Sequence, residues 1–554
     1  MIIRVARSEM GQGSYTALPM LVAEELECDW SKVKAEYASV AEHLRRNRVY
    51  VSFSTGGSRS IRGSQEFLRQ AGAAAREMLI AAAAQQWGVP TSDCQASNSV
   101  ITHRPSGRTL TFGAVAEAAS HLTPPKSVTL KPPEQWKLIG KPTKRFDTTD
   151  TVLGKPVFGV DVRLPDMLYA AIRQCPVFGG TLKTYDEATV KSRKGVRQVV
   201  PLKDAVAVVA ESWWQANQAV ETMSVTWDEG PNAKVSSADI MTFLRGGLTA
   251  ADAAVSRNDG DARAALASAS KVVEAEYFAP FLAHATMEPM TCTAQVTADR
   301  FEVWAPTQNA EATLAAAAEA AGMPPGKGEV HVTFLGGGFG RRGAFQDYTR
   351  QAVMIAKAVG KPVKLLWTRE EDMQHDHYRP VSLVKLSAGL DASGTPVAFL
   401  ARVSGQSIIA GLAPANVANG IDLNFLEGLQ LVEQLLIGVA HGLDKIRQHG
   451  FRALVGVRQQ AAHVLAGQGT VEALAADARG IVESPSLFAA AKQALLVEPV
   501  QRGHDRGVGE TRGILCVHLP DGRFLAPPHA FHDLGFQLAQ GLRAAAAGPS
   551  QPRK

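Results

Sequence analysis

The sequence predicts an α+β protein made of several domains, and three observations support this fold class. The chain has 554 residues, which corresponds to about three to five units of ordinary domain size. Its first part has apolar residues at helical spacing, whereas residues 155–230 carry short β-like runs broken by Gly and Pro. Over residues 272–400, strand-like and helix-like segments alternate, which is typical of helices packed on a mixed sheet.

The N-terminal part is expected to hold two helices and a polar linker. Apolar residues recur at helical spacing between Thr16 and Leu26, which predicts a helix there. A longer helix is predicted from Ser64 to Trp87, because Ala, Leu and Met favour helix. Residues 122–150 contain five prolines and are expected to form a linker.

The middle of the chain supplies the predicted sheets and their helices. Apolar and β-branched runs between turn residues predict strands at Val157–Val162, Met167–Ile172 and Ala205–Val209, within a compact α+β domain. The later alternating region is predicted to contain strands Arg300–Trp304, Val330–Leu335 and Val363–Trp367, and helices Ala310–Ala321 and Tyr348–Val359.

The C-terminal part differs in composition from the rest. All Trp and Tyr residues lie at or before Tyr378, so the last 176 residues contain neither. We therefore leave residues 429–554 unassigned, as a helical or disordered segment. Our hypothesis is that this segment derives from a shifted reading frame or a rearranged gene, which translation of the other two frames would test.

Charge and cysteine usage argue against several classes of protein. The net charge of +5 is mild, and without a dense basic stripe it does not predict nucleic-acid binding. No run of 18 apolar residues predicts a membrane span. The first ten residues lack the apolar core of a signal peptide, so the chain as written is expected in the cytoplasm; a missing export signal would make it periplasmic. The cysteines are too scattered for a protein-ligated metal site or a disulfide framework: Cys28, Cys94, Cys175, Cys292 and Cys516.

Three glycine-rich turns are the main candidates for ligand binding. The turn at 335–342, LGGGFGRR, follows a predicted strand, and its glycines let a backbone approach a ligand closely. Arg341 and Arg342 would add charge for an anion, although Arg341 breaks the dinucleotide fingerprint and no Walker A ending is present. A purely structural turn is equally consistent with this pattern.

The other two turns lie in the N-terminal part. The first, EMGQG at 9–13, is also consistent with a simple tight turn. The second, TGGSRS at 55–60, precedes a helix and suits either a phosphate site or an ordinary N-cap. His284 is expected to be a satisfied structural residue, and the charged run Thr368–Met373 is expected to be a solvated loop.

Taken together and in this order, the motifs resemble those of one enzyme family. The segments SEMGQG, TGGSRS, HATMEPM, WAPTQ, LGGGFGRR and TREEDMQHDHYRP are similar to the molybdopterin-binding (large or beta) subunit of the xanthine dehydrogenase/aldehyde oxidase superfamily. The Arg–Arg pair after GGGFG is similar to the branch that contains the beta subunits of isoquinoline 1-oxidoreductase. The resemblance covers about residues 4–428.

The resemblance implies a multi-domain molybdenum-cofactor-binding fold with an α/β hammerhead domain. It assigns residues 1–121 to an N-terminal cofactor-binding segment that begins inside a strand of the family, so we expect it to be truncated at its N-terminus. Residues 122–153 become a linker, 154–235 the hammerhead domain and 236–428 the main molybdopterin-binding domain.

Site residues are also implied by the resemblance. Gln308 would lie beside an oxo ligand of molybdenum, and Phe339 beside the substrate. The late Gly-Glu-Pro motif that carries the family's general base is echoed only by Glu510, a weak candidate. The residues that would hold the pterin, its phosphate or cytidine extension, or line the metal are Gly11, Gln12, Gly13, Gly56, Gly57, Ser58, Gln308, Gly337, Gly338, Phe339, Gly340 and Arg341.

The implied reaction is oxidative hydroxylation of an N-heteroaromatic or aldehyde, with water as the oxygen source. The cofactor would be molybdenum-molybdopterin, in the cytosine dinucleotide form, held without protein ligands to the metal. Electrons would leave through a separate small subunit with [2Fe-2S] clusters. Two alternatives stay open: an inactive, truncated or frame-shifted family member, and a non-catalytic pterin-binding protein.

Overall fold

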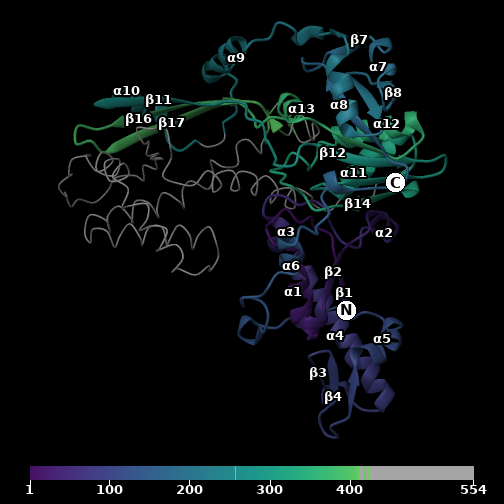
Figure 1. Ribbon diagram of the computed structural model, residues 1–554. Helices are drawn as coiled ribbons and strands as arrows, with labels where there is room; N and C mark the ends of the chain where they lie inside the picture. The colour runs from purple at the N-terminus through teal and green to yellow at the C-terminus, as the bar shows by residue number, and fades with distance from the viewer. Residues whose placement is uncertain (256–257, 409, 411–416, 419–420, 423–554) are drawn as a thin grey trace, which may run out of the picture. The chain divides into compact units, whose positions relative to one another are not determined.

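The computed structural model describes residues 1–255, 258–408, 410, 417–418 and 421–422 (Figure 1). The predictions for residues 429–554, including Glu510 and the reading-frame hypothesis, lie outside the described residues. The chain forms two compact units. The first unit contains residues 1–234 and 283–378, and the second contains the described residues of 235–282 and of the chain after 378.

A mixed seven-stranded sheet forms the centre of the first unit. Its strand order is β14-β13-β12-β15-β6-β9-β8. The β13–β14 and β15–β6 pairs are parallel and the other pairs are antiparallel. The strands are β6 (Leu168–Gln174), β8 (Val196–Pro201), β9 (Ala205–Ala210), β12 (Thr291–Val296), β13 (Phe301–Ala305), β14 (Gly328–Val332) and β15 (Val363–Leu366).

Helices cover both faces of this sheet. Helices α11 (Ala310–Ala321) and α12 (Asp347–Val359) pack on the face that includes Ile172 and Val209. Helix α8 (Trp213–Thr222) packs on the opposite face. Strand β9 is therefore buried at every position, which explains its unbroken apolar sequence. Small elements complete this region: α7 (Ala188–Lys191) and the antiparallel pair β7 (Thr181–Tyr185) and β10 (Val225–Asp228).

The N-terminal part of the same unit is built around two packed helices, α1 (Ser14–Leu26) and α4 (Gln65–Trp87). Gly72 permits their close approach, because a Cβ there would overlap the backbone carbonyl oxygen of Val22. The remaining elements are β1 (Ile2–Val5) paired with β2 (Lys34–Tyr37), the sheet β3 (Cys94–Ser97), β4 (Val100–His103) and β5 (Thr109–Thr111), and helices α2 (Val40–Arg45), α3 (Arg59–Arg62), α5 (Phe112–Ser120) and α6 (Thr148–Val152).

The predicted linker is fastened to this helix pair by buried carboxylates. Glu24 accepts hydrogen bonds from the backbone N–H groups of Lys137 at 3.0 Å and Leu138 at 2.7 Å, and from the Lys131 amine at 2.8 Å. The neighbouring Glu25 pairs with Arg69 at 2.7 Å. Burial raises the pKa of Glu24, but Lys131 and the backbone donors outweigh burial and lower the pKa below its usual value.

We expect Glu24→Gln to destabilise the protein by about 1–3 kcal/mol at neutral pH, since it weakens several hydrogen bonds to a buried charge. Because the folded pKa is depressed, this stabilisation is present above the pKa of the unfolded chain and is lost as the pH falls through the folded value. Urea unfolding at pH 7 and at pH 3 measures it. Glu117→Gln, at an exposed position, is the matched control. If both variants lost the same free energy of unfolding at pH 7, the hydrogen bonds of Glu24 to the linker would not stabilise the fold.

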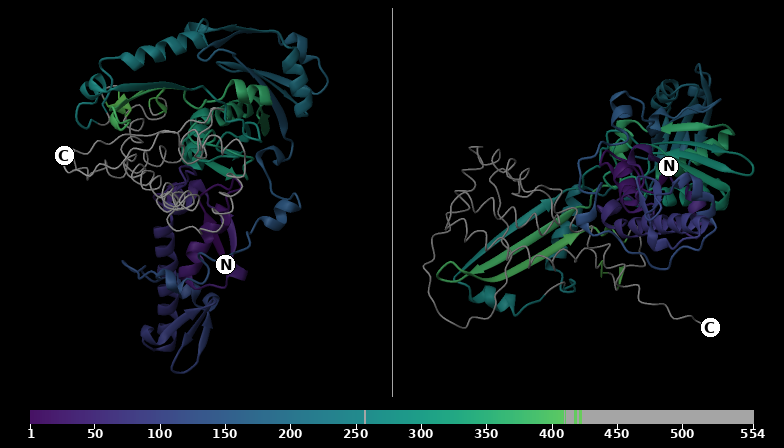
Figure 2. Two further views of the ribbon diagram at one scale, coloured as in Figure 1. Left: turned by 90° about the vertical axis from the view of Figure 1, so that its left-hand side faces the viewer. Right: turned by 90° about the horizontal axis from the view of Figure 1, so that it is seen from below.

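The second unit contains a long antiparallel sheet. Its strands are β11 (Lys271–Ala279), β16 (Ser382–Leu390) and β17 (Pro396–Gly405), in the order β11-β16-β17 (Figure 2). Helix α9 (Ser237–Thr249) packs Leu244 and Leu248 against Val381 and Leu383. Helix α10 (Ala262–Ser268) and the short pair β18 (Val417–Ala418) and β19 (Ile421–Asp422) complete its described part.

The structure confirms the predicted α+β class and most of the predicted elements. The helix predicted at Ala310–Ala321 is α11 residue for residue, and the helix predicted at Ser64–Trp87 is α4. Two interpretations are wrong. Val157–Val162 is not a strand but contains a 3-10 turn at Gly159–Asp161, and the run Thr368–Met373 is not a solvated loop but contains helix α13 (Arg369–Gln374) with Asp372 buried.

The physical reasons for these two errors are local. A Cβ at Gly159 would lie 2.7 Å from Pro306 and 2.8 Å from Thr291, so this glycine marks a close backbone approach and not a strand position. Asp372 is held by Arg369, and this pairing permits its burial.

The boundary predicted at residue 235, between the hammerhead domain and the main molybdopterin-binding domain, stays a prediction. Strand β6, from the predicted hammerhead region, pairs with β15 across that boundary, so both regions contribute to one sheet. Within the described residues, no helix is long and apolar enough to cross a lipid bilayer.

Candidate functional site

The predicted ligand-binding turns meet at one edge of the seven-stranded sheet. Strands β13 and β14 are parallel neighbours, so the segments that follow them leave the sheet at the same edge. Gln308 lies in the segment after β13, and Gly336–Gly340 lies in the segment after β14. The Gln308 N–H donates to the Arg342 carbonyl at 3.0 Å, which ties these two segments together.

Ser8 and Thr55 bring the two N-terminal turns to the same place. The Ser8 hydroxyl donates to the Thr307 carbonyl at 2.6 Å, and the Ser8 N–H donates to the Thr55 hydroxyl at 2.9 Å. The Thr55 N–H donates to the Gln308 carbonyl at 2.7 Å. Four segments distant in sequence are therefore joined by buried hydrogen bonds, as a single binding site requires.

Gln308 lies where these segments meet, and both the nitrogen and the oxygen of its side-chain amide form hydrogen bonds. Its amide nitrogen donates to the Thr55 carbonyl at 3.0 Å, and its amide oxygen accepts from the Gly340 N–H at 2.9 Å. The side chain is buried. The amide therefore couples the TGGSRS turn to the GGGFG turn.

Gly338 allows the backbone to pass directly over Gln308. A Cβ at this position would clash with the Gln308 amide and would lie 2.9 Å from the Met10 sulfur. Only a residue without a side chain fits here, so the GGGFG turn can lie against both Gln308 and the EMGQG turn.

The EMGQG turn is organised around the buried carboxylate of Glu9. The carboxylate accepts hydrogen bonds from the N–H groups of Gly11 at 2.8 Å, Gly13 at 2.9 Å and Tyr15 at 2.8 Å. Arg145, from the predicted linker, pairs with Glu9 at 3.3 Å and donates to the Gly11 carbonyl at 2.7 Å. The N–H groups of Gly11 and Gly13 are therefore already engaged within the protein.

Gln12 is likewise folded onto its own turn. Its amide nitrogen donates to the Ser8 carbonyl at 2.9 Å and to the Ser14 hydroxyl at 3.0 Å, while its oxygen accepts from the Met10 N–H at 2.6 Å. The roles predicted for Gly11, Gln12 and Gly13 in cofactor binding stay predictions.

Other backbone donors of the site are available to a ligand. The N–H groups of Gly56, Gly57, Gly337, Gly338 and Phe339 make no hydrogen bond with any residue in the described part of the chain. They belong to the two turns that Gln308 couples. Backbone N–H groups without a partner in the described chain suit a ligand rich in oxygen and phosphate, and so the residues of these two turns fit a pterin cofactor.

Ser58 and Phe339 both have a left-handed backbone. Ser58 is the N-cap of α3 with φ of 51°, and its side chain makes no capping hydrogen bond. Phe339 has φ of 52° and is 69% exposed, between Gly337 at 95° and Gly340 at 103°. An exposed aromatic residue in this conformation is unfavourable for folding, and such outliers concentrate at binding sites.

We expect Phe339→Gly to be more stable than Phe339→Ala by about 1 kcal/mol, because glycine adopts a left-handed backbone without a Cβ penalty. Both variants lose the exposed ring, so their difference isolates the backbone term. Urea unfolding of the two proteins measures it. If Phe339→Ala were the more stable, the backbone of this turn would not be strained.

Arg341 and Arg342 are fully buried beneath the turn. The Arg341 guanidinium donates to both carboxylate oxygens of Asp347, at 2.9 and 2.8 Å, and pairs with Asp376 at 2.8 Å. Arg342 donates to the carbonyls of Glu288 and Pro289. The two positive charges that we expected to attract an anion are therefore neutralised by protein carboxylates. A role for Arg341 in cofactor binding stays a prediction.

Residues without a predicted role also build the site. Glu288 lies in the HATMEPM motif; its carboxylate accepts from the Gly336 N–H at 3.0 Å, and its own N–H donates to the Gly336 carbonyl at 2.9 Å. Asp376 binds both the backbone and the ring of His284, so His284 is satisfied as expected. Glu288 and Asp376 both lie in motifs that the resemblance rests on, HATMEPM and TREEDMQHDHYRP, but neither motif indicated these contacts.

Two stretches of the chain match the family described as molybdopterin cofactor-binding domain: residues 1–160 and residues 249–408. The chain is 29% identical to the beta chain of isoquinoline 1-oxidoreductase from Brevundimonas diminuta, over 73% of this chain and 58% of that protein. It is 30% identical to the membrane-bound aldehyde dehydrogenase (pyrroloquinoline-quinone) of Gluconacetobacter polyoxogenes, over 76% and 55%.

A third relative, a nicotinate dehydrogenase subunit of Pseudomonas putida, is 27% identical over 71% of this chain and 33% of that protein. Among solved structures, quinoline 2-oxidoreductase of Pseudomonas putida is 19% identical, with a TM-score of 0.40, over 48% of this chain and 39% of that chain. The chain thus spans a little over half the length of the first two relatives and a third of the third. With both cofactor-binding domains matched, it belongs to the molybdopterin-binding large-subunit family of the xanthine dehydrogenase/aldehyde oxidase superfamily.

Proposed function

We propose that this protein is the large subunit of a molybdenum hydroxylase that oxidises an N-heteroaromatic or aldehyde substrate with water as the oxygen donor. The observation that carries the proposal is the junction of four glycine-bearing or polar segments around Gln308. The names of the relatives, which include isoquinoline, aldehyde and nicotinate oxidation, support the substrate classes.

The chain's own residues would bind and orient the cofactor. The free N–H groups of Gly56 and Gly57 suit its phosphate or cytidine extension, and those of Gly337 and Gly338 suit polar groups near the metal. When bound, molybdenum-molybdopterin, here proposed in its cytosine dinucleotide form, supplies the two-electron chemistry of the hydroxylation. The exposed ring of Phe339 is placed to contact a planar substrate.

The proposed partner is a small subunit with [2Fe-2S] clusters, because two electrons must leave for each substrate oxidised. Among the described residues, no group of three or more His, Cys, Asp or Glu side chains could hold a metal ion. The described cysteines, Cys28, Cys94, Cys175 and Cys292, are all free thiols.

An isotope experiment tests the proposed reaction. The full chain, purified with its iron–sulfur partner, is incubated with an aldehyde or an N-heteroaromatic, a dye acceptor and ¹⁸O-labelled water. We expect labelled hydroxylated product only from preparations that contain molybdenum. Product without label would contradict water as the donor, and metal-loaded protein without any turnover would favour the alternative of a non-catalytic pterin-binding protein.

A further inference from the structure

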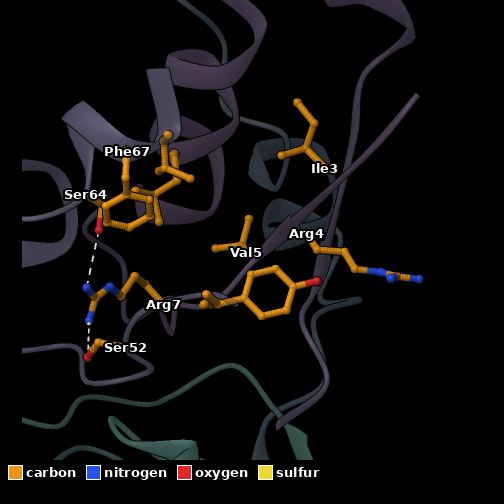
Figure 3. Close-up of a pocket in the computed structure, with 11 residues that line it drawn as sticks. Ile3, Arg4, Val5, Arg7, Ser52, Ser64 and Phe67 are labelled. Carbon is orange, nitrogen blue, oxygen red and sulfur yellow. Dashed lines mark hydrogen bonds between the residues drawn. The ribbon is translucent and has the colours of Figure 1, made fainter. Parts of the chain in front are cut away.

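Arg7 is a buried cation whose charge is not balanced by any acidic side chain in the described part of the chain. Arg7 precedes the EMGQG turn in the chain by two residues and is 6% exposed. The guanidinium donates to the Ser52 hydroxyl at 3.2 Å and to the Ser64 hydroxyl at 3.3 Å (Figure 3). It also donates to the Ser54 carbonyl. All three acceptors are neutral.

The other buried arginines of the described chain are different. Arg341 is paired with Asp347 and Asp376, and Arg342 lies 3.6 Å from a Glu288 carboxylate oxygen. Burying a charge without a partner costs several kcal/mol, and proteins ordinarily avoid it. The contrast indicates that the partner of Arg7 is a ligand.

The surroundings of Arg7 are electropositive. Burial, reinforced by the nearby charge of Arg59, lowers the pKa of Arg7 to about 10, so it stays charged at neutral pH. Ser64 is the N-cap of the 23-residue helix α4, whose N-terminus carries partial positive charge. The Ser64 side chain does not cap this helix and is turned to Arg7 instead. Glu66 of the first turn is exposed, and its carboxylate accepts from Gln70.

A small cavity adjoins these groups. Its volume is about 30 Å³, and its polar lining comes from Arg4, Arg7, Tyr50, Ser52 and Ser64 (Figure 3). The rest of its lining is apolar, with residues such as Val5 and Phe67. The space accommodates a small group and not a nucleoside.

We propose that Arg7, the hydroxyls of Ser52 and Ser64, and the N-terminus of α4 bind a phosphate-like oxyanion. The guanidinium supplies the counter-charge and a planar pair of donors, the geometry that phosphate oxygens prefer. The anion is either free inorganic phosphate or the phosphate of a bound cofactor. Because free phosphate would serve equally, this site does not depend on the proposed catalytic function.

Thermal unfolding of the full chain with added inorganic phosphate tests the site. Phosphate is titrated at constant ionic strength, maintained with chloride, into wild type, Arg7→Met, Arg7→Lys and Arg4→Gln. Arg4 lines the same cavity, but its side chain is 50% exposed and pairs with Glu42, so Arg4→Gln is the matched control. We expect phosphate at about 100 times its Kd to raise the Tm of wild type by roughly 2–4 °C.

The variants distinguish ligand binding from a structural role of Arg7. The phosphate-induced rise in Tm is expected to persist in Arg4→Gln, to shrink in Arg7→Lys and to vanish in Arg7→Met. If Arg7 only supported the fold, Arg7→Met would lower the Tm by the same amount at every phosphate concentration, which would overturn the proposal. A wild type insensitive to phosphate, when free of cofactor, would overturn it as well, even if the Arg7 variants failed to fold.

A comparison of cofactor-loaded and cofactor-free protein identifies the source of the anion. If the cofactor's phosphate fills the site, only the cofactor-free protein responds to added phosphate. If the site is separate, both preparations respond. Both outcomes support the phosphate site. If the protein never acquires molybdenum but still responds to phosphate, the proposed catalytic function fails and the phosphate site stands.

Discussion

Gly338→Ala is expected to destabilise the protein and to reduce its molybdenum content strongly. A Cβ at Gly338 would overlap the buried Gln308 amide and approach the Met10 sulfur. Gln308 cannot move away without breaking its hydrogen bonds to the Thr55 carbonyl and the Gly340 N–H. Overpacking of this kind costs about 1–3 kcal/mol, and each buried polar group left without a partner adds about 1–3 kcal/mol.

Gly246→Ala is the control for this substitution. Gly246 lies inside helix α9, and a Cβ there would meet nothing within 4 Å. We expect this control to keep or slightly raise stability, since alanine favours helix over glycine. Urea unfolding and metal analysis are read on both variants. Wild-type stability and metal content in Gly338→Ala would show that the close approach over Gln308 is not required.

Asp376→Asn is expected to lower the free energy of unfolding by about 3–5 kcal/mol, because it breaks a buried ion pair and leaves part of the Arg341 charge unbalanced. Asp376 is 2% exposed and lies 2.8 Å from the Arg341 guanidinium. It also accepts hydrogen bonds from His284. Burial raises the pKa of Asp376, but the hydrogen bonds from His284 and the charge of Arg341 outweigh it and lower the pKa.

The sign of the pH dependence follows from this lowered pKa. The stabilisation from Asp376 is complete above the pKa of an unfolded aspartate, about 3.9, and is lost as the pH falls further. Asp376→Asn should therefore differ most from wild type near neutral pH. Asp150→Asn is the control, since its side chain is 59% exposed in a surface pair with Lys155 and is expected to cost less than about 1 kcal/mol.

A double-mutant cycle separates the pair from its neighbours. In an Arg341→Met background, Asp376→Asn should cost markedly less than in wild type, because contacting charges are not additive. Equal costs in both backgrounds would mean that Asp376 acts only through His284.

The helices and strands of the sheet were accessible to sequence analysis because their apolar patterns are local. Helix α11 and strand β9 are examples: one repeats apolar residues at helical spacing, and the other is an unbroken apolar run. Gly159 shows the limit of such patterns, since its neighbours read as a strand while the glycine serves a close contact with Pro306.

The site was predictable only in part, because the residues that assemble it are far apart in the sequence. The glycine turns and Gln308 stand out as motifs, and the structure joins them. Ser8 makes the hydrogen bonds that join the turns, to Thr55, 47 residues away, and to Thr307, 299 residues away. No local pattern in the sequence reveals partners at such distances. Arg341 illustrates the converse: its charge suggested an anion, but distant Asp376 neutralises it.

The most direct test of this account is the molybdenum and pterin content of the full chain, purified from a host that makes the cofactor. If the turns around Gln308 hold one cofactor, wild type and Gly246→Ala should carry equimolar metal, pterin and protein, and Gly338→Ala should carry little of either. Folded wild-type protein from that host with neither molybdenum nor pterin would contradict the account.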